Sequence, residues 1–368
     1  MKNIQSTEKL QEKAILFGCS TSNKDDGVFS LKELERLAET ANVEVLGKLF
    51  QKAKEITPAT YIGTGKVEEL KELIESAGAN LAICDNELSG SQVNNLSEIL
   101  GVKVIDRTTL ILDIFAKHAT TNEGRLQVEL AMLKYYLPRL SGIAGTSGRF
   151  GSGGVGMRGP GETKLELDKR KIRDQINKLE KEIAKIKQDR ALRRKNRSNS
   201  NIKRVSIVGY TNAGKSTLMN IITKANIYAD DKLFATLDTT TRNLWLAPNC
   251  QIVLTDTVGF INKLPHSFVE AFSATLEEVV YSDLIIHVID LTDKHLDIHK
   301  EVVLKELEKL GAHNLPRITV YNKIDVLTTE EKIRLRNSEI VEKDAIFISA
   351  KQNENIEKIK NAIIEKLF

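Results

Sequence analysis

Apolar positions in the first hundred residues alternate between short continuous runs and segments with helical spacing. The runs and the helical segments follow one another in the order 14–18, 31–41, 43–46, 67–77, 81–84, 93–100 and 102–105. Buried parallel strands read as short apolar runs, and the helices that connect them show a period of 3.6 residues. The pattern therefore predicts a small parallel α/β sheet in an N-terminal domain over residues 1–120.

Two longer segments with heptad spacing come next. Leucines recur from Leu126 to Leu140, and Leu or Ile recurs from Leu165 to Ile186. Two such segments joined by a short connection are typical of an antiparallel helical hairpin. Extended to Arg197, the second helix has about 34 residues and spans roughly 50 Å. We therefore expect a coiled-coil arm over residues 121–197.

The connection between these heptads, residues 142–161, is rich in glycine. It has 9 glycines in 20 residues and also carries Arg149, Phe150 and Arg158. Glycine lets the main chain approach a ligand closely, and arginine can bind phosphates or stack on bases. The segment is consistent with a flexible linker or with a tip that contacts RNA through these three side chains.

Composition excludes several protein classes. Of the 368 residues, 41% are hydrophobic and 28% are charged, which excludes a disordered or collagen-like chain. No apolar stretch approaches the 18 or so residues of a membrane span, and the first residues are polar. Three distant cysteines give neither a disulfide framework nor a zinc site. We expect a cytoplasmic protein without a membrane span.

Positive charge is concentrated in the second heptad helix. The chain has a formal net charge of +4, whereas residues 164–197 contain 14 basic and 6 acidic residues, a net charge of +8. A solvated helix face would explain this charge, and so would contact with the phosphates of RNA.

Residues 209–216, with the sequence GYTNAGKS, form a complete phosphate-binding loop between an apolar run and a helical segment. In such a loop the backbone amides surround the phosphates, Lys215 reaches the β and γ groups, and the Ser216 hydroxyl binds Mg²⁺. The candidate nucleotide-binding residues of this segment are Gly209, Asn212, Ala213, Gly214, Lys215, Ser216 and Thr217.

Three further motifs follow apolar runs in the last 170 residues. They are Asp256-Thr-Val-Gly259, Asn322-Lys323-Ile-Asp325 and Ser349-Ala350-Lys351. An acid at position 256 can hold Mg²⁺ through water, and the Gly259 amide can contact the γ-phosphate. A carboxylate at Asp325 accepts hydrogen bonds from guanine N1–H and the 2-amino group, which adenine cannot offer. Together the motifs predict GTP as substrate and GDP as product.

At this point the sequence resembles the HflX family of GTPases over nearly its whole length. The resemblance rests on the phosphate loop, on residues 158–163 (RGPGET), on DTVGF at 256–260, and on residues 233–242 (LFATLDTTTR). The last segment resembles the family's switch I, which implies that Thr236 contacts Mg²⁺ and the γ-phosphate. Lys215, Thr236 and Gly259 are then the expected catalytic residues, and Ser216, Thr236 and Asp256 the expected Mg²⁺ site.

The resemblance also implies an architecture and a partner. We expect the α/β domain and the coiled-coil arm to be followed by a P-loop GTPase domain over residues 198–368, with a mostly parallel sheet. Family members bind the large ribosomal subunit, and some split 70S ribosomes under stress, with the arm directed at ribosomal RNA; no DNA contact is expected. Thr239, Lys164 and Leu167 depart from the family pattern. With 19 residues after Ser349, we expect no added C-terminal domain.

Phe260 occupies the position where many GTPases have a glutamine that orients water. A phenyl ring cannot hydrogen-bond to water as an amide does, so we expect slow hydrolysis by the protein alone and stimulation by ribosomes.

Two alternatives remain. The chain could be a GTP-regulated RNA-binding or subunit-assembly factor without splitting activity. Alternatively, the N-terminal domain could use ATP for RNA remodelling, although residues 60–67 (TYIGTGKV) lack the first glycine and the final hydroxyl of a complete phosphate loop.

Overall fold

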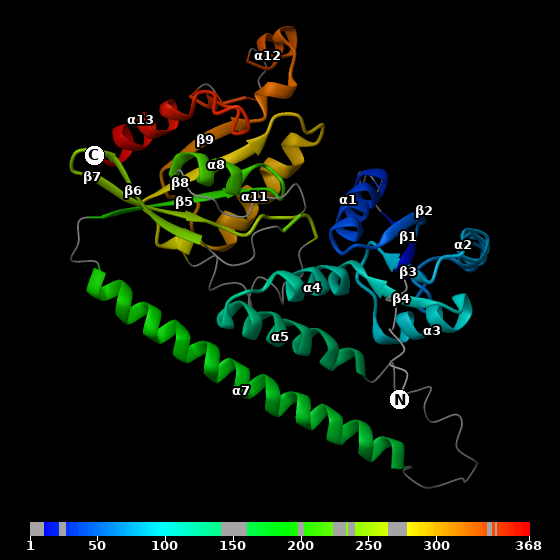
Figure 1. The fold of residues 1–368 in the computed structure, drawn as a ribbon. Coiled ribbons are helices and arrows are strands. Elements are labelled where there is room, and N and C mark those ends of the chain that lie inside the picture. The colour runs from blue at the N-terminus through cyan, green and yellow to red at the C-terminus, as the bar shows by residue number, and fades with distance from the viewer. Residues whose placement is uncertain are drawn as a thin grey trace, which may run out of the picture. The chain divides into compact units, whose positions relative to one another are not determined.

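The computed structural model describes residues 11–21, 27–140, 160–197, 202–223, 233–234, 240–263, 278–336, 341–342 and 344–368. The chain divides into two compact units (Figure 1). One consists of Met1–Ile114 with Met132–Lys178, and the other of Phe115–Ala131 with Leu179–Phe368.

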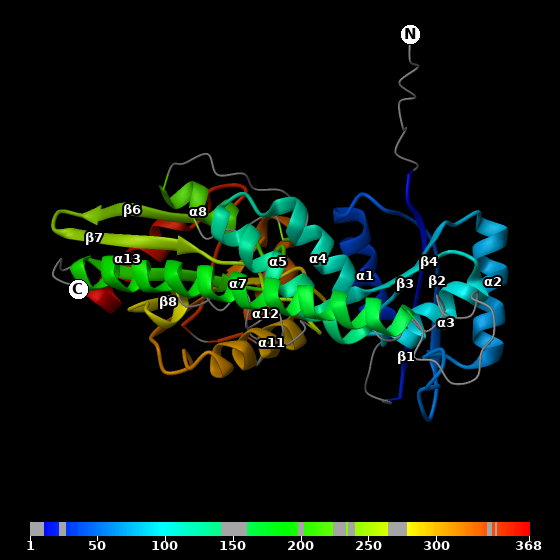
Figure 2. The same ribbon diagram turned by 90° about the horizontal axis from the view of Figure 1, so that it is seen from below.

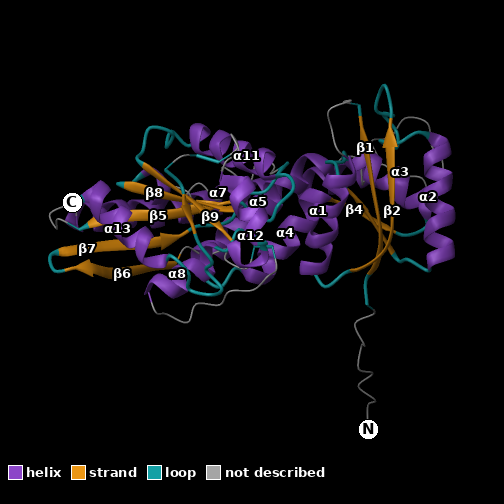
Figure 3. Ribbon diagram, turned by 90° about the horizontal axis from the view of Figure 1, so that it is seen from above, coloured by secondary structure: helices purple, strands orange, loops and turns teal. Residues whose placement is uncertain are grey.

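The first unit contains a four-stranded parallel sheet with the strand order β2-β1-β3-β4. Its strands and connecting helices are β1 (Lys13–Ser20), α1 (Gly27–Thr40), β2 (Glu44–Lys52), α2 (Thr64–Ala77), β3 (Leu81–Cys84), α3 (Gly90–Leu100) and β4 (Lys103–Asp106). Apolar residues of α2 and α3 pack against one face of this sheet, and α1 packs against β1 and β2 on the other face (Figure 3). The predicted α/β architecture is confirmed.

Local sequence explains where these helices begin and end. The Ser89 hydroxyl accepts the Gln92 amide at 3.2 Å, and the Gln92 side chain accepts the Ser89 amide, which makes a capping box at the start of α3. Helices α2 and α3 end at Gly78 and Gly101, whose φ angles of 66° and 70° suit glycine.

The helices after β4 are α4 (Arg107–His118), α5 (Asn122–Tyr136), the 3₁₀ turn η1 (Leu137–Arg139) and α7 (Pro160–Arg197). Helix α5 passes directly into η1 around Pro138, which has no N–H for the α-helical hydrogen-bond ladder, and Leu140 is again helical. Helix α7 is one continuous helix of 38 residues (Figure 2), about 57 Å long.

The predicted heptad positions of α7 differ in burial. Ile176, Leu179 and Ile183 are buried, whereas Leu165, Ile172 and Ile186 are half-buried. Near the other end of α7, Arg190 pairs with Glu123 of α5 at 2.5 Å. Pairing of the two helices as a coiled-coil arm stays a prediction.

The second unit contains a six-stranded sheet with the order β10-β9-β8-β5-β7-β6, in which β6 runs antiparallel to β7 and the other described pairs are parallel. Its elements are β5 (Lys203–Gly209), α8 (Lys215–Thr223), β6 (Thr240–Ala247), β7 (Cys250–Asp256), β8 (Leu284–Asp290), α11 (Leu296–Lys309), β9 (Arg317–Asn322), η2 (Ile324–Val326), α12 (Thr329–Arg336), β10 (Ile346–Phe347) and α13 (Ile356–Leu367).

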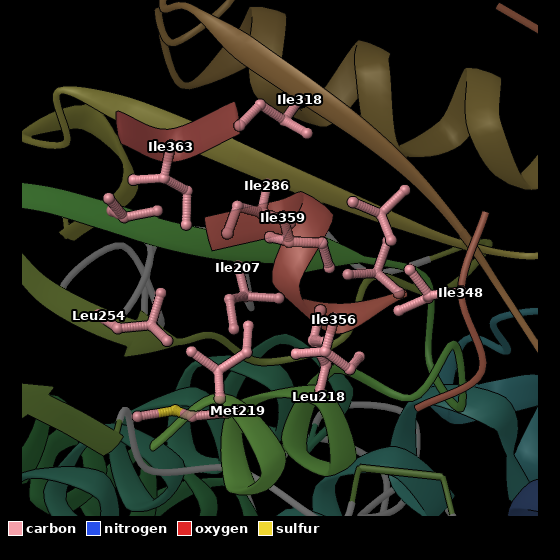
Figure 4. Close-up of a cluster of buried hydrophobic side chains, with 14 of the residues drawn as sticks. Ile207, Leu218, Met219, Leu254, Ile286, Ile318, Ile348, Ile356, Ile359 and Ile363 are labelled. Carbon is pink, nitrogen blue, oxygen red and sulfur yellow. The ribbon is translucent and has the colours of Figure 1, made fainter. Parts of the chain in front are cut away.

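The core of this unit lies between the sheet and helices α8 and α13 (Figure 4). Ile207 and Ile286 of the central strands meet Leu218 and Met219 of α8 and Ile359 of α13, and all five are fully buried. Helix α11 contacts β5 and β8, and its Leu296 belongs to a separate apolar cluster. Because apolar residues cover both faces of this sheet, a polar binding site is expected at the carboxyl ends of its parallel strands.

None of the helices in the part of the chain that the structure describes combines the length and apolar character that a membrane span needs.

Candidate functional site

The loop between β5 and α8 follows the carboxyl end of a central strand. Gly214 has a φ of 90° and Asn212 a φ of 61°. A Cβ on Gly214 would lie 2.2 Å from Nδ2 of Asn322, and a Cβ on Gly209 would lie 2.3 Å from the carbonyl oxygen of Val288. Close packing therefore requires glycine at both positions where the sequence motif has it.

Lys215 is the first residue of α8 and is buried within this loop. Its ammonium group donates a hydrogen bond to the Tyr210 carbonyl at 2.8 Å. Burial lowers the pKa of Lys215 to about 8, and the nearby Asp256 carboxylate opposes that shift. The lysine is thus held across the loop, where a phosphate oxygen can attract it.

Ser216 and Asp256 meet beside Lys215. The Ser216 hydroxyl donates to Oδ2 of Asp256 at 2.6 Å. Asp256 is the last residue of β7 and is fully buried, while Ser216 is the second residue of α8. The register of β5 with β7, which places Ile207 opposite Asp256, brings these two predicted Mg²⁺ ligands together.

Gly259 lies against the phosphate loop. A Cβ there would be 2.9 Å from each of Lys215 Nζ, Thr211 Cα and Thr211 Cγ2. The next residue, Phe260, accepts the Thr211 amide at 2.8 Å and donates its own amide to the Gly209 carbonyl at 3.1 Å. The Phe260 side chain is buried, so it contributes to packing.

Asn322 connects the phosphate loop to the loop after β10. Its Nδ2 donates to the Ala213 carbonyl at 2.9 Å, and its Oδ1 accepts the Ala350 amide at 2.9 Å. Only 2% of Asn322 is exposed, and both partners are buried. This one side chain therefore fixes the distance between the phosphate loop and the predicted base loop.

The predicted base-recognition residues converge at the same edge. Ser349 donates its hydroxyl to Oδ1 of Asp325 at 2.6 Å, which orients that carboxylate. Lys323, with a φ of 66°, pairs with Asp290 at 2.7 Å. Lys351 is exposed next to Ala350.

Several predicted residues lie outside the described part of the chain. These are Thr236 of the switch I segment and the three RNA-contact residues Arg149, Phe150 and Arg158. Thr217 is described and is half-buried in the first turn of α8.

Sequence reasoning missed a group of side chains around Tyr210. The Tyr210 ring stacks on His299 of α11, with centroids 3.6 Å apart and planes 14° apart. His299 Nδ1 lies 2.6 Å from Oδ2 of Asp293, and the Tyr210 hydroxyl accepts the Asn262 amide at 2.7 Å. The sequence spacing of His295 and His299 gives no hint of this contact, because it depends on how α11 packs.

A second missed contact involves the switch I segment. Phe234, which is buried and has a φ of 56°, packs edge-on against Phe115 of α4 with ring centroids 4.6 Å apart. The predicted motif begins at Leu233, so this contact lies at its start.

Two aspartates at the carboxyl ends of the strands in the first sheet accept hydrogen bonds from other groups of the protein. Asp85 accepts the Ser30 hydroxyl at 2.5 Å and an Arg107 N–H at 2.8 Å. Asp106 accepts the amides of Leu88 and Thr109. These internal bonds favour a structural role for that edge over a second nucleotide site.

Comparison with known families accounts for most of the chain. Residues 29–116 match a family model described as GTP-binding GTPase N-terminal, residues 118–197 match GTP-binding GTPase Middle Region, and residues 204–323 match 50S ribosome-binding GTPase.

Individual relatives agree with these models. The GTPase HflX of Caldanaerobacter subterraneus subsp. tengcongensis is 52% identical over 97% of this chain and 81% of its own length. The GTPase HflX of Escherichia coli is 42% identical over 94% of this chain and 80% of its own length. A solved complex of SsGBP with GDP is 28% identical, covers 96% of this chain and 98% of its own, and has a TM-score of 0.51. This chain belongs to the HflX family of GTPases.

Proposed function

We propose that this protein binds GTP and Mg²⁺ at the edge of the six-stranded sheet, associates with the large ribosomal subunit through its arm, and dissociates or rescues 70S ribosomes under stress. The observation that carries the nucleotide part is the bridge made by Asn322, which joins the phosphate loop at Ala213 to the base loop at Ala350 with two 2.9 Å hydrogen bonds. A nucleotide has its phosphates and its base at opposite ends, so this spacing suits one molecule that contacts both loops.

The residues around Ser216 fit Mg²⁺. The Ser216 hydroxyl and the Asp256 carboxylate provide the hard oxygen ligands that this ion prefers, and Asp256 suits contact through water. Thr236 is the proposed third contact. When bound, Mg²⁺ neutralises phosphate charge, and Lys215 adds a second positive charge on the same side.

Slow hydrolysis by the protein alone follows from the chemistry of Phe260. Its side chain is buried and offers no hydrogen bond to an attacking water. The Gly259 amide and the Lys215 ammonium stabilise charge at the phosphates without activating water. Orientation of the water must then come from the ribosome, and a partner's help of this kind is worth roughly 10³- to 10⁵-fold.

The ribosome-binding part of the proposal rests on charge and on family. Helix α7 contains the whole of residues 164–197, with their net charge of +8, and has exposed basic residues such as Lys171, Arg173 and Lys185. Positive side chains along a helix bind RNA phosphates and make the affinity strongly dependent on salt. We therefore assign RNA contact to the arm and to Arg149, Phe150 and Arg158 of its tip, and place the protein in the cytoplasm.

GTP turnover with and without ribosomes tests this proposal, together with sedimentation of 70S ribosomes. Addition of 70S ribosomes or large subunits should raise turnover by at least tenfold, and removal of residues 142–159 should abolish the increase while GDP affinity is kept. With a non-hydrolysable GTP analogue, the wild-type protein should move 70S ribosomes into the subunit peaks. Binding to the large subunit without loss of the 70S peak would instead support an RNA-binding or assembly factor.

A further inference from the structure

The Tyr210 side chain connects the phosphate loop to two other segments of the same unit. Its hydroxyl accepts the backbone N–H of Asn262 at 2.7 Å, and its ring lies flat against His299 of α11. Only 7% of Tyr210 is exposed. The Lys215 ammonium donates to the carbonyl oxygen of this same residue, so Tyr210 contacts the catalytic lysine through its backbone.

His299 is itself held in place. Its Nδ1 lies 2.6 Å from Oδ2 of Asp293, and the other oxygen of that carboxylate accepts the His295 amide at 2.8 Å. The stacked geometry, with planes 14° apart, restricts rotation of the Tyr210 ring about its side-chain bonds. The tyrosine hydroxyl therefore has a fixed position relative to the phosphate loop.

That position determines the path of residues 259–262, which lie next to the phosphate loop at the start of the segment after β7, here called switch II. Phe260 exchanges two backbone hydrogen bonds with Gly209 and Thr211, and the Tyr210 hydroxyl holds Asn262 two residues further on. Gly259 precedes the first of these bonds and sits against Lys215, with no space for a Cβ. These three hydrogen bonds therefore fix the backbone immediately on the carboxyl side of Gly259.

We propose that Tyr210 is a positioning residue for GTP hydrolysis: stacked on His299, its hydroxyl fixes the start of switch II so that the Gly259 amide stays directed at the γ-phosphate. This inference rests on the proposed function. Because GDP has no γ-phosphate, the Tyr210 hydroxyl should matter for the hydrolysis rate and for GTP binding more than for GDP binding.

Tyr210→Phe tests the role, because it removes the hydroxyl and keeps the ring. The full chain is assayed for GTP turnover, GDP affinity and thermal unfolding. We expect kcat to fall roughly two- to tenfold, the range for one ordinary hydrogen bond, with the Kd for GDP changed by less than about twofold. Tyr281→Phe is the matched control, since Tyr281 is 49% exposed and precedes β8 at the sheet end opposite the phosphate loop.

Substitution of His299 tests the stack. His299→Ala removes the ring against which Tyr210 lies, and should lower kcat to a similar extent; His299→Phe, which retains a flat ring, should restore most of that loss. A merely structural role for either residue predicts that kcat, GDP affinity and melting temperature change together. It also predicts that His299→Leu, which has an apolar side chain without a ring, has the same kcat as His299→Phe.

The outcomes separate the two claims. Unchanged kcat in Tyr210→Phe, or a parallel loss of kcat and GDP affinity, contradicts the positioning role while leaving GTP hydrolysis by the wild type intact. Absence of GTP hydrolysis by the wild type, with and without ribosomes, contradicts the proposed function and this inference with it.

Discussion

Asn322→Ala is the substitution whose effect follows most directly from the structure. It removes both hydrogen bonds of the bridge and leaves the Ala213 carbonyl and the Ala350 amide without their partner inside the protein. A buried polar group that loses its partner costs about 1–3 kcal/mol, so two such groups cost about 2–6 kcal/mol. For a unit of about 200 residues, each kcal/mol lowers the melting temperature by roughly 2–4 °C. We therefore expect a decrease of at least about 4 °C.

Differential scanning calorimetry with and without GDP measures this effect. In the wild type, GDP should raise the melting temperature of the nucleotide-binding unit through ligand linkage. In Asn322→Ala both the melting temperature and the GDP-induced increase should be smaller, because the phosphate and base loops lose their fixed separation. Asn243→Ala, an exposed asparagine on β6, is the control and should resemble the wild type. A melting temperature and a GDP response of Asn322→Ala equal to those of the control would refute the bridge.

Three further predictions concern the base, the lysine and the arm. Asp325→Asn should weaken GTP binding by two to four decades, because two charge-assisted hydrogen bonds worth about 1.5–3 kcal/mol each are lost, and should favour a xanthosine nucleotide; unchanged GTP affinity in equilibrium titrations would contradict the base assignment. Since the pKa of Lys215 is lowered to about 8, the unbound protein loses a proton there as pH rises, and phosphates favour the charged form. GTP affinity should therefore decrease between pH 8 and about pH 9, by up to tenfold, and Lys215→Ala should bind weakly with no such slope; equal slopes in fluorescence titrations of the two proteins would exclude Lys215 as the cause. Replacing Arg149 and Arg158 by Ala should weaken ribosome binding and flatten its dependence on salt while GTP affinity is kept; an unchanged salt dependence in sedimentation assays would count against the tip.

Local patterns predicted the fold well where one segment determines its own structure. Residues 81–84 were predicted as a strand and form β3, because a short apolar run in a parallel sheet is buried on both faces. The helical spacing over residues 67–77 likewise predicted α2, which begins three residues earlier at Thr64. The leucine spacing to Leu140 predicted a continuous α-helix, whereas the structure changes from α5 to the 3₁₀ turn η1 at Leu137 and is helical again at Leu140.

The candidate site was predictable only where its residues belong to one local motif. Motifs such as GYTNAGKS specify their own loop, and their residues come together in the structure because parallel strands end at one edge. The contact between Tyr210 and His299 depends on a packing angle between α11 and the phosphate loop, which no local pattern encodes. The same holds for Phe115 and Phe234, which are separated by more than a hundred residues.

Isothermal titration calorimetry of the purified full chain with Mg²⁺ tests the central claim most directly. Binding of GDP and GTP with one site per chain, and no measurable heat from ATP at the same concentrations, is the result we predict. Uptake of ATP by a protein that ignores both guanine nucleotides would contradict the account.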